Sequence, residues 1–277
     1  ADRLLLKAEG RIEYTSLIYL PSKAQFDLFF RDQAVGLQLY VRKVLIKDRC
    51  EELLAPHLRF VRGVVDSADL QLNVSREMLQ HDRQVKAIRT FVTKKTLDAI
   101  ERLKQDEPDA MRTLWAEFGA VLKEGLAAGD EFRDRLLDLV LSESSRAEGP
   151  TSLGDYVERM GGDQEHIYYL GGASLDAVRH SPHLESFTRR NIEVLFFADP
   201  VDEFWLQHDL SYTGKKFASI SQGEIDLGKD QKEADTPTDT SDTTRFDGLL
   251  QTLRTHLQDD IKDIRLSSRL ESTPHIR

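Results

Sequence analysis

The chain has 277 residues, a length typical of about two domains, and 40% of its residues are hydrophobic, which is enough to form buried cores. Its net charge of −10 argues against a nucleic-acid partner, because phosphate contacts need clustered lysine and arginine. The single cysteine, Cys50, excludes an internal disulfide and a multi-cysteine zinc site, so no metal and a reducing, cytoplasmic location are expected. No apolar run approaches the roughly 20 residues that span a bilayer, so no membrane contact is expected.

Residues 1–145 are predicted to form a large α/β sandwich that ends in a short helical connector. The chain begins without methionine, so residues 1–10 are interpreted as the continuation of a longer protein. β-Branched, aromatic and alternating apolar residues predict strands at 11–20, 35–46 and 58–65. The polar pair Arg42 and Lys43 within the second strand is interpreted as a β-bulge. Apolar residues at helical spacing predict helices at 75–105, about 108–123 and 130–141.

A smaller α/β part is predicted for residues 146–221, after a polar hinge at 142–150. Ser152 and Asp155 have the spacing of a capping box, which predicts a short helix. The remaining pattern alternates strands with helices, an order typical of a small parallel sheet: strands at 166–170, 192–198 and 216–220, and helices at 174–189 and 201–209. Residues 222–244 are predicted to be an acidic flexible linker, and residues 245–277 a truncated α+β C-terminal piece.

Motifs of common enzymes are absent from the sequence, including the Gly-x-x-x-x-Gly-Lys phosphate loop, the His-Glu-x-x-His zinc motif and the Gly-x-Ser-x-Gly nucleophile motif. Gly171 and Gly172, between a predicted strand and a predicted helix, could bind a phosphate through free N–H groups. A tight turn is the more common use of such a pair. The basic residues of the helix at 75–105 are interpreted as a solvated face, because acidic residues such as Asp98 and Glu101 balance them.

Residues 26–30 form the first candidate functional segment. They contain three phenylalanines, Phe26, Phe29 and Phe30, together with Leu28. Either two of the rings are buried and the third is incidental, or the segment is an exposed apolar patch for a protein partner. The sequence leaves both interpretations open.

Residues 69–80 form the second candidate segment, because they place an arginine at the predicted start of a helix. Ser75 is a suitable N-cap, so Arg76 falls in the first turn, where the helix dipole is already positive. Glu77 is a poor partner for it, because neighbouring side chains on a helix diverge. Arg76 is therefore either structural or a ligand of an external anion, for which a phosphate held by two parallel hydrogen bonds is the natural candidate.

Residues 72–80, with the sequence Leu-Asn-Val-Ser-Arg-Glu-Met-Leu-Gln, resemble the catalytic-loop motif of the heat-shock protein 90 chaperone family. The chain is most similar to the bacterial form of the family, because residues 221–244 lack the long charged insertions of the organelle forms. Further stretches resemble the same family in the same order: residues 14–17, 21–24, 39–41, 58–67, 118–125, 167–169, 181–185 and 202–203. The resemblance covers nearly the whole chain apart from the acidic segment. Gln71 departs from the family pattern, in which proline is common, so the loop before Arg76 is expected to be less rigid.

The resemblance implies the middle segment of a dimeric, ATP-driven chaperone that binds unfolded client proteins and acts in the stress response. The nucleotide pocket, which holds ATP with Mg²⁺, and the catalytic glutamate would belong to an N-terminal domain outside this chain. The isolated chain is therefore expected to bind no cofactor and to have no ATPase activity. Most of the C-terminal dimerisation domain is also expected to lie outside it.

The same resemblance implies a role for each candidate residue. Arg76 would reach the γ-phosphate of ATP, with Gln80 as its polar support and Asn73 shaping the loop. Two sets of apolar residues would contact other proteins or domains. Leu70 and Leu72 would contact the closing N-terminal domain, and the clients would contact Phe26, Leu28, Phe29 and Phe30. The alternative is a protein-interaction scaffold for clients and co-chaperones, in which Arg76 is structural and has no direct role in ATP hydrolysis.

Overall fold

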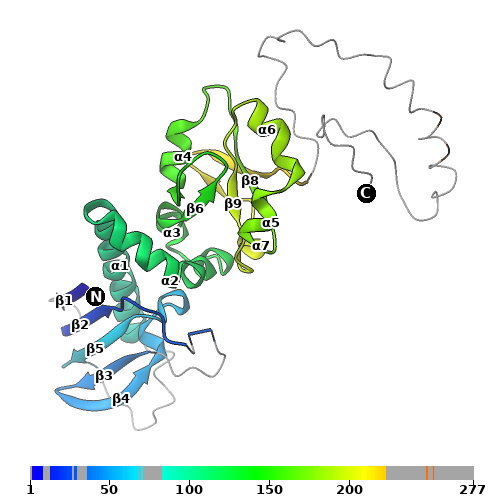
Figure 1. Ribbon diagram of the computed structural model, residues 1–277. Helices are drawn as coiled ribbons and strands as arrows, with labels where there is room; N and C mark the ends of the chain where they lie inside the picture. The colour runs from blue at the N-terminus through cyan, green and yellow to red at the C-terminus, as the bar shows by residue number, and fades with distance from the viewer. Residues whose placement is uncertain are drawn as a thin grey trace.

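The computed structural model describes residues 2–8, 13–26, 28–29, 36–68, 70, 83–222, 248 and 252, and the statements below concern these residues. The predicted linker at 222–244 and the C-terminal piece at 245–277 lie almost entirely outside them. Figure 1 shows two β-sheets with helices between them, so the predicted α/β class is confirmed.

The first sheet contains five strands among the described residues: β1 (Asp2–Ala8), β2 (Tyr14–Leu20), β3 (Leu37–Val41), β4 (Val44–Cys50) and β5 (Arg62–Ser67). Their order across the sheet is β1-β2-β5-β3-β4. β1 pairs antiparallel with β2, so that Leu5 lies opposite Leu17. The sequence does not predict β1, because its consecutive leucines show no alternation, and Leu5 is largely exposed.

Arg42 and Lys43 form a tight turn between β3 and β4, so the prediction of a β-bulge there is wrong. Both residues adopt left-handed backbone conformations, with φ of 50° and 65°, as a two-residue hairpin turn requires. Contacts with β5 stabilise this unfavourable geometry. The N–H of Arg42 donates to the carbonyl of Ser67 at 3.3 Å, and the N–H of Lys43 donates to Asp66 Oδ1 at 3.1 Å.

The strand predicted at 58–65 begins later than expected, because Pro56–Leu58 forms a short 3-10 helix that continues into a turn. A similar short helix spans Glu51–Leu53. Gly63 near the start of β5 has φ of +152°, and a Cβ atom there would lie 2.2 Å from the carbonyl oxygen of Leu17. Only glycine allows β5 to approach β2 this closely.

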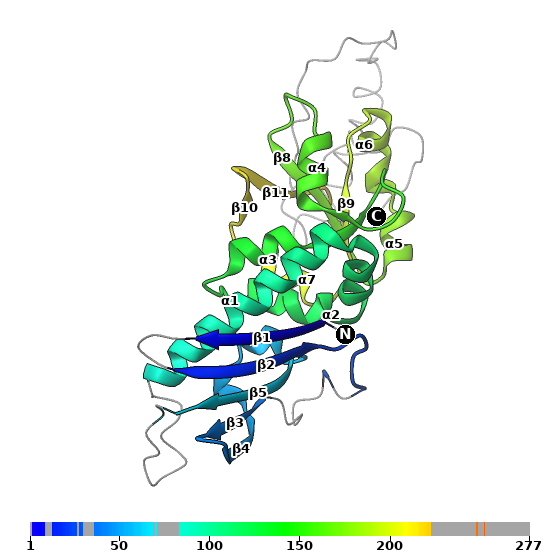
Figure 2. The ribbon, with the colours of Figure 1, turned by 90° about the vertical axis from the view of Figure 1, so that its left-hand side faces the viewer.

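Three helices follow the sheet: α1 (Arg83–Asp106), α2 (Pro108–Ala127) and α3 (Arg133–Leu139). Figure 2 shows α1 and α2 between the first sheet and the rest of the molecule. The predicted helical spacing is confirmed, since Val85, Ile88 and Val92 of α1 are all buried. The rings of Phe60 and Phe118 stack at 4.3 Å between the short helix region and α2.

The second sheet contains the strands β6 (Leu141–Ser144), β7 (Thr151–Ser152), β8 (His166–Gly171), β9 (Leu195–Phe197), β10 (Ser211–Tyr212) and β11 (Lys215–Ser219). Its order is β10-β11-β8-β9-β6-β7, and β8 pairs parallel with β9 and with β11, as predicted. Its helices are α4 (Leu153–Arg159), α5 (Leu175–Arg179), α6 (Glu185–Arg189) and α7 (Asp202–Trp205), with a 3-10 helix at Pro182–Leu184. The capping box of Ser152 and Asp155 is present at α4.

The polar segment predicted to be a hinge at 142–150 begins inside the second sheet. β6 pairs antiparallel with both β7 and β9. Ser142 and Ser144 are buried there, and hydrogen bonds satisfy their hydroxyls. Ser142 donates to the carbonyl of Phe196 at 2.7 Å, and Ser144 donates to Glu193 Oε1 at 2.6 Å. The second sheet therefore already includes residues from Leu141 onward, before the domain division expected at 145, which stays a prediction.

A continuous apolar core joins the two parts of the chain. It extends from β2 and β5, through α1 and α2, to Tyr156 of α4 and Trp205 of α7, both fully buried. Lys123 of α2 also crosses this junction, since its Nζ lies 2.6 Å from Asp202 Oδ1 and 2.7 Å from Asp199 Oδ2. Within the described part of the chain, no helix combines the length and the apolar character needed to cross a bilayer.

Candidate functional site

The segment 71–82, which carries Arg76, lies between two fixed elements. On one side, β5 is fixed at its end: the Ser67 hydroxyl donates to the carbonyl of Glu13 at 3.0 Å, and Arg42 Nε donates to the carbonyl of Ala68 at 3.3 Å. Leu70, just beyond, is only 5% exposed and belongs to the core. Both the strand and the first residues after it are therefore held in place.

On the other side of this segment, α1 is fixed from its first turn. Val85 and Ile88 are 1% and 0% exposed, so they anchor the beginning of the helix in the core. Arg83 and Lys86, on the same turns, are exposed, as are Arg42 and Lys43 at the β3–β4 turn. An anion that approached the segment would therefore meet basic side chains on the elements at both of its ends.

The predicted catalytic residues Asn73, Arg76 and Gln80 lie outside the described residues, as does Leu72. Their roles stay predictions. Leu70 is buried in the core, so in this conformation it has almost no surface for contact with another domain.

The phenylalanine segment lies in the loop after β2, residues 21–29, which we call the aromatic loop. Phe26 is 91% exposed and Phe29 is 59% exposed. The interpretation in which two of the three rings are buried is therefore wrong, and Phe30 lies outside the described residues. Leu28 is 1% exposed, so it belongs to the core and not to the surface set with which it was grouped.

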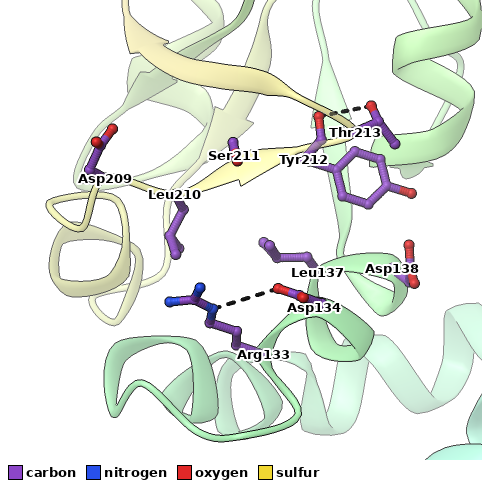
Figure 3. A pocket seen from close by; sticks show the side chains of 9 residues that line it. All are labelled: Arg133, Asp134, Leu137, Asp138, Asp209, Leu210, Ser211, Tyr212 and Thr213. Carbon is purple, nitrogen blue, oxygen red and sulfur yellow. Dashed lines mark hydrogen bonds and ion pairs between the residues drawn. The ribbon is translucent and has the colours of Figure 1, made fainter.

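A cavity of about 400 Å³ opens between α3 and β10 (Figure 3). Its lining includes Asp134, Asp138 and Asp209, with Arg133 as its basic residue. Burial, together with Asp138, raises the pKa of Tyr212 in this lining to about 12, so the phenol stays neutral. Three carboxylates disfavour a phosphate ligand, and no described residue of the predicted site lines this cavity.

Two further predicted features can be compared with the structure. The N–H of Gly172 donates to the carbonyl of Phe197 at 3.1 Å, so this group is not free for a phosphate and the turn interpretation of the glycine pair is favoured. In the part of the chain that the structure describes, no group of three or more histidine, cysteine or acidic side chains is arranged to hold a metal ion.

Comparison with known proteins identifies the family. The family model described as Hsp90 protein matches residues 3–276. The chain belongs to the Hsp90 family. It is 46% identical over 274 residues to Chaperone protein HtpG of Streptomyces coelicolor and 45% identical over 273 residues to that of Mycobacterium leprae. These alignments cover 99% and 98% of this chain but only 43% and 42% of the relatives, so the chain spans about two fifths of their length.

A solved structure places the chain within the Hsp90 architecture. The middle domain of a Plasmodium falciparum heat shock protein superposes with a TM-score of 0.70 and 28% identity. The match covers 79% of this chain and 87% of that domain. The described residues therefore have the fold of an Hsp90 middle domain, as the motif resemblance implies.

The structure also shows exposed apolar residues of this Hsp90 chain that the sequence does not single out. Phe204 of α7 is 64% exposed, although its neighbour Trp205 is fully buried. Val44 and Leu45 at the start of β4 are 62% and 47% exposed. No local pattern distinguishes these residues from buried ones, because β4 lies at the edge of the sheet and α7 is only four residues long.

Proposed function

We propose that this chain is the middle segment of an ATP-dependent Hsp90 chaperone that acts as a homodimer in the cytoplasm and binds unfolded client proteins during stress. Its Hsp90 middle-domain fold and its likeness to proteins named Chaperone protein HtpG support the chaperone assignment. In this proposal ATP, with Mg²⁺, is bound mainly by the N-terminal domain of the same chaperone.

Arg76 completes the ATPase site in this proposal by contacting the γ-phosphate of that ATP. The supporting observation is that β5 and α1, the elements before and after the segment 71–82, are anchored in the core, while Arg42, Lys43, Arg83 and Lys86 are exposed at the β3–β4 turn and at the start of α1. A guanidinium that arrives only on domain closure stabilises the charge of the transition state more than it stabilises initial nucleotide binding. Gln80 and Asn73 are proposed to orient Arg76 and its loop.

The full-length chaperone carrying Arg76→Ala tests this role. We expect its ATPase rate to fall at least about tenfold, because arginines supplied by a separate domain contribute roughly 10³ to 10⁵ in other phosphoryl-transfer enzymes, while domain closure limits part of the gain here. ATP affinity and melting temperature should change little. Arg76→Lys should also have a much lower ATPase rate, since an ammonium cannot form the two parallel hydrogen bonds of a guanidinium. Arg112→Ala, which removes an exposed arginine of α2, is the matched control and should retain activity.

A retained ATPase rate in the Arg76→Ala protein would favour the scaffold alternative instead. A sharp fall in melting temperature together with the rate would show that Arg76 is structural. Either result would remove Arg76 from the ATPase site without affecting the family assignment.

Client contact is proposed for Phe26 and Phe29, because their rings are 91% and 59% exposed among the described residues. Burying a phenylalanine normally stabilises a protein by roughly 1.5–3 kcal/mol, so two exposed rings in one loop offer apolar surface that a partner can bury. Phe26→Ser combined with Phe29→Ser should weaken the binding of an unfolded protein without lowering the melting temperature. Unchanged binding would contradict this contact.

A further inference from the structure

The backbone of the aromatic loop is connected to α2 on both sides of Phe26. Before it, the N–H of Ala24 donates to Glu117 Oε2 at 2.7 Å. After it, the carbonyl of Leu28 accepts a hydrogen bond from Arg59 Nε at 3.1 Å, and Arg59 in turn pairs with Glu124. Because Glu117 and Glu124 are seven residues apart, they lie on one face of α2, about 10 Å apart along its axis.

Arg59 is the central residue of the second connection. Its NH1 and NH2 groups donate to Glu124 Oε2 and Oε1 at 2.5 and 2.8 Å, and NH1 also donates to the carbonyl of Pro56 at 3.2 Å. The Arg59 side chain is only 18% exposed. A planar guanidinium donates to both carboxylate oxygens through two nitrogens and to the Leu28 carbonyl through the third, a geometry that the single nitrogen of a lysine ammonium cannot reproduce.

The loop itself adopts a tight turn that brings Phe26 to its outer corner. The N–H of Leu28 donates to the carbonyl of Gln25 at 3.0 Å and closes this turn. The Gln25 side chain accepts a hydrogen bond from Arg62 NH2 at 2.6 Å, and the Leu28 side chain is inserted in the core. The backbone on each side of Phe26 is thus fixed, while the rings of Phe26 and Phe29 are exposed.

We propose that Arg59 and Glu124 are positioning residues for client binding. They hold the aromatic loop so that Phe26 and Phe29 stay presented, although the client touches neither member of the ion pair. A loop that is already ordered loses less conformational entropy on binding than a loose one, and ordering each backbone residue costs roughly 1–2 kcal/mol. The inference rests on the client contact proposed above.

Binding of a permanently unfolded protein to this chain tests the inference. The probe is fluorescently labelled, reduced and carboxymethylated α-lactalbumin, followed by anisotropy. We expect Glu124→Ala to weaken binding about tenfold, and Glu124→Gln to have an intermediate effect, because an amide oxygen still accepts one hydrogen bond. Hydrogen exchange across residues 21–29 should accelerate in Glu124→Ala, whereas its melting temperature should stay within a few degrees of the wild type.

The matched control is Glu143→Ala, which removes the partner of Arg179 in a comparable ion pair of the small part, with 27% exposure of the glutamate. It should bind the probe like the wild type. The positioning role would be overturned if Glu124→Ala and Glu143→Ala lost equal affinity for the probe. It would also be overturned if Glu124→Ala lost affinity without faster hydrogen exchange in the aromatic loop. If Glu124→Ala does not fold, Glu124→Gln decides by the same criteria.

The double variant Phe26→Ser and Phe29→Ser separates this inference from the client contact on which it rests. If the double variant loses binding and Glu124→Ala does not, the rings contact the client but Arg59 and Glu124 do not position them. If the double variant, like Glu124→Ala, binds as tightly as the wild type, or if the wild type itself does not bind the probe, the client contact fails and the positioning role fails with it.

Discussion

Replacing Lys123 by methionine should destabilise the chain strongly, because it removes one member of a buried ion pair. Lys123 and Asp202 are 5% and 4% exposed, and their charged atoms lie 2.6 Å apart. Loss of one partner from such a pair costs roughly 3–5 kcal/mol, since the other charge stays buried without compensation. Here Asp202 keeps hydrogen bonds from the Trp205 indole at 2.7 Å and the Asp199 N–H at 3.0 Å, so we expect the lower end of that range.

A loss of about 3 kcal/mol corresponds to a fall of roughly 6–12 °C in melting temperature for a chain of this size. Urea unfolding followed by circular dichroism gives the free energy directly. The matched control is Lys216→Met, because the Lys216–Asp209 pair is 61% and 79% exposed and should contribute less than about 1 kcal/mol. If Lys123→Met costs no more than this control, the ion pair does not hold the two parts together and the reasoning is wrong.

Three further predictions concern buried polar groups. Tyr156→Phe should lower the free energy of urea unfolding by about 1–3 kcal/mol. The Tyr156 hydroxyl donates to the carbonyl of Glu193 at 2.9 Å and accepts from the Tyr168 N–H at 3.0 Å. An unchanged urea midpoint would contradict this prediction. Burial lowers the pKa of His57 below 6.5 in the folded chain, although Asp130 opposes the shift. The unfolded chain therefore binds more protons than the folded chain at low pH, so the free energy of unfolding should fall as the pH drops below about 6.5. His57→Gln should make stability less dependent on pH, and an equal slope of stability against pH in both proteins would refute this role of His57. Burial raises the pKa of Cys50 to about 12, so iodoacetamide at about pH 8 should label this thiol only after unfolding, which mass spectrometry would show.

Elements whose pattern is local could be predicted from the sequence. The spacing of Val85, Ile88 and Val92 identified α1, and the Ser152 and Asp155 pair identified the start of α4, because the interactions involved lie within a few residues. The parallel strands β8, β9 and β11 of the small part were also predictable, since each of these apolar runs is bounded by turn residues. In these cases neighbouring residues determine the structure.

Elements that depend on distant partners could not be predicted in the same way. β6 has a polar sequence, and its serines are buried only because Glu193 and Phe196 accept their hydrogen bonds across about 50 residues of chain. The turn at Arg42 and Lys43 likewise needs the carbonyl of Ser67. The same limit applies to the candidate site: the sequence indicated an aromatic segment, but the pairing of Arg59 with Glu124, 65 residues away, became visible only in the structure.

The direct passage from α3 into β6 has a mechanical consequence. No linker separates the end of α3 at Leu139 from the start of β6 at Leu141, and the residues on both sides belong to one apolar core. A rotation applied to the first sheet is therefore transmitted to the second instead of being absorbed between them. If the chain were divided near residue 140, each fragment would expose apolar residues that are buried in the shared core. The two parts should therefore fold and unfold as one cooperative unit.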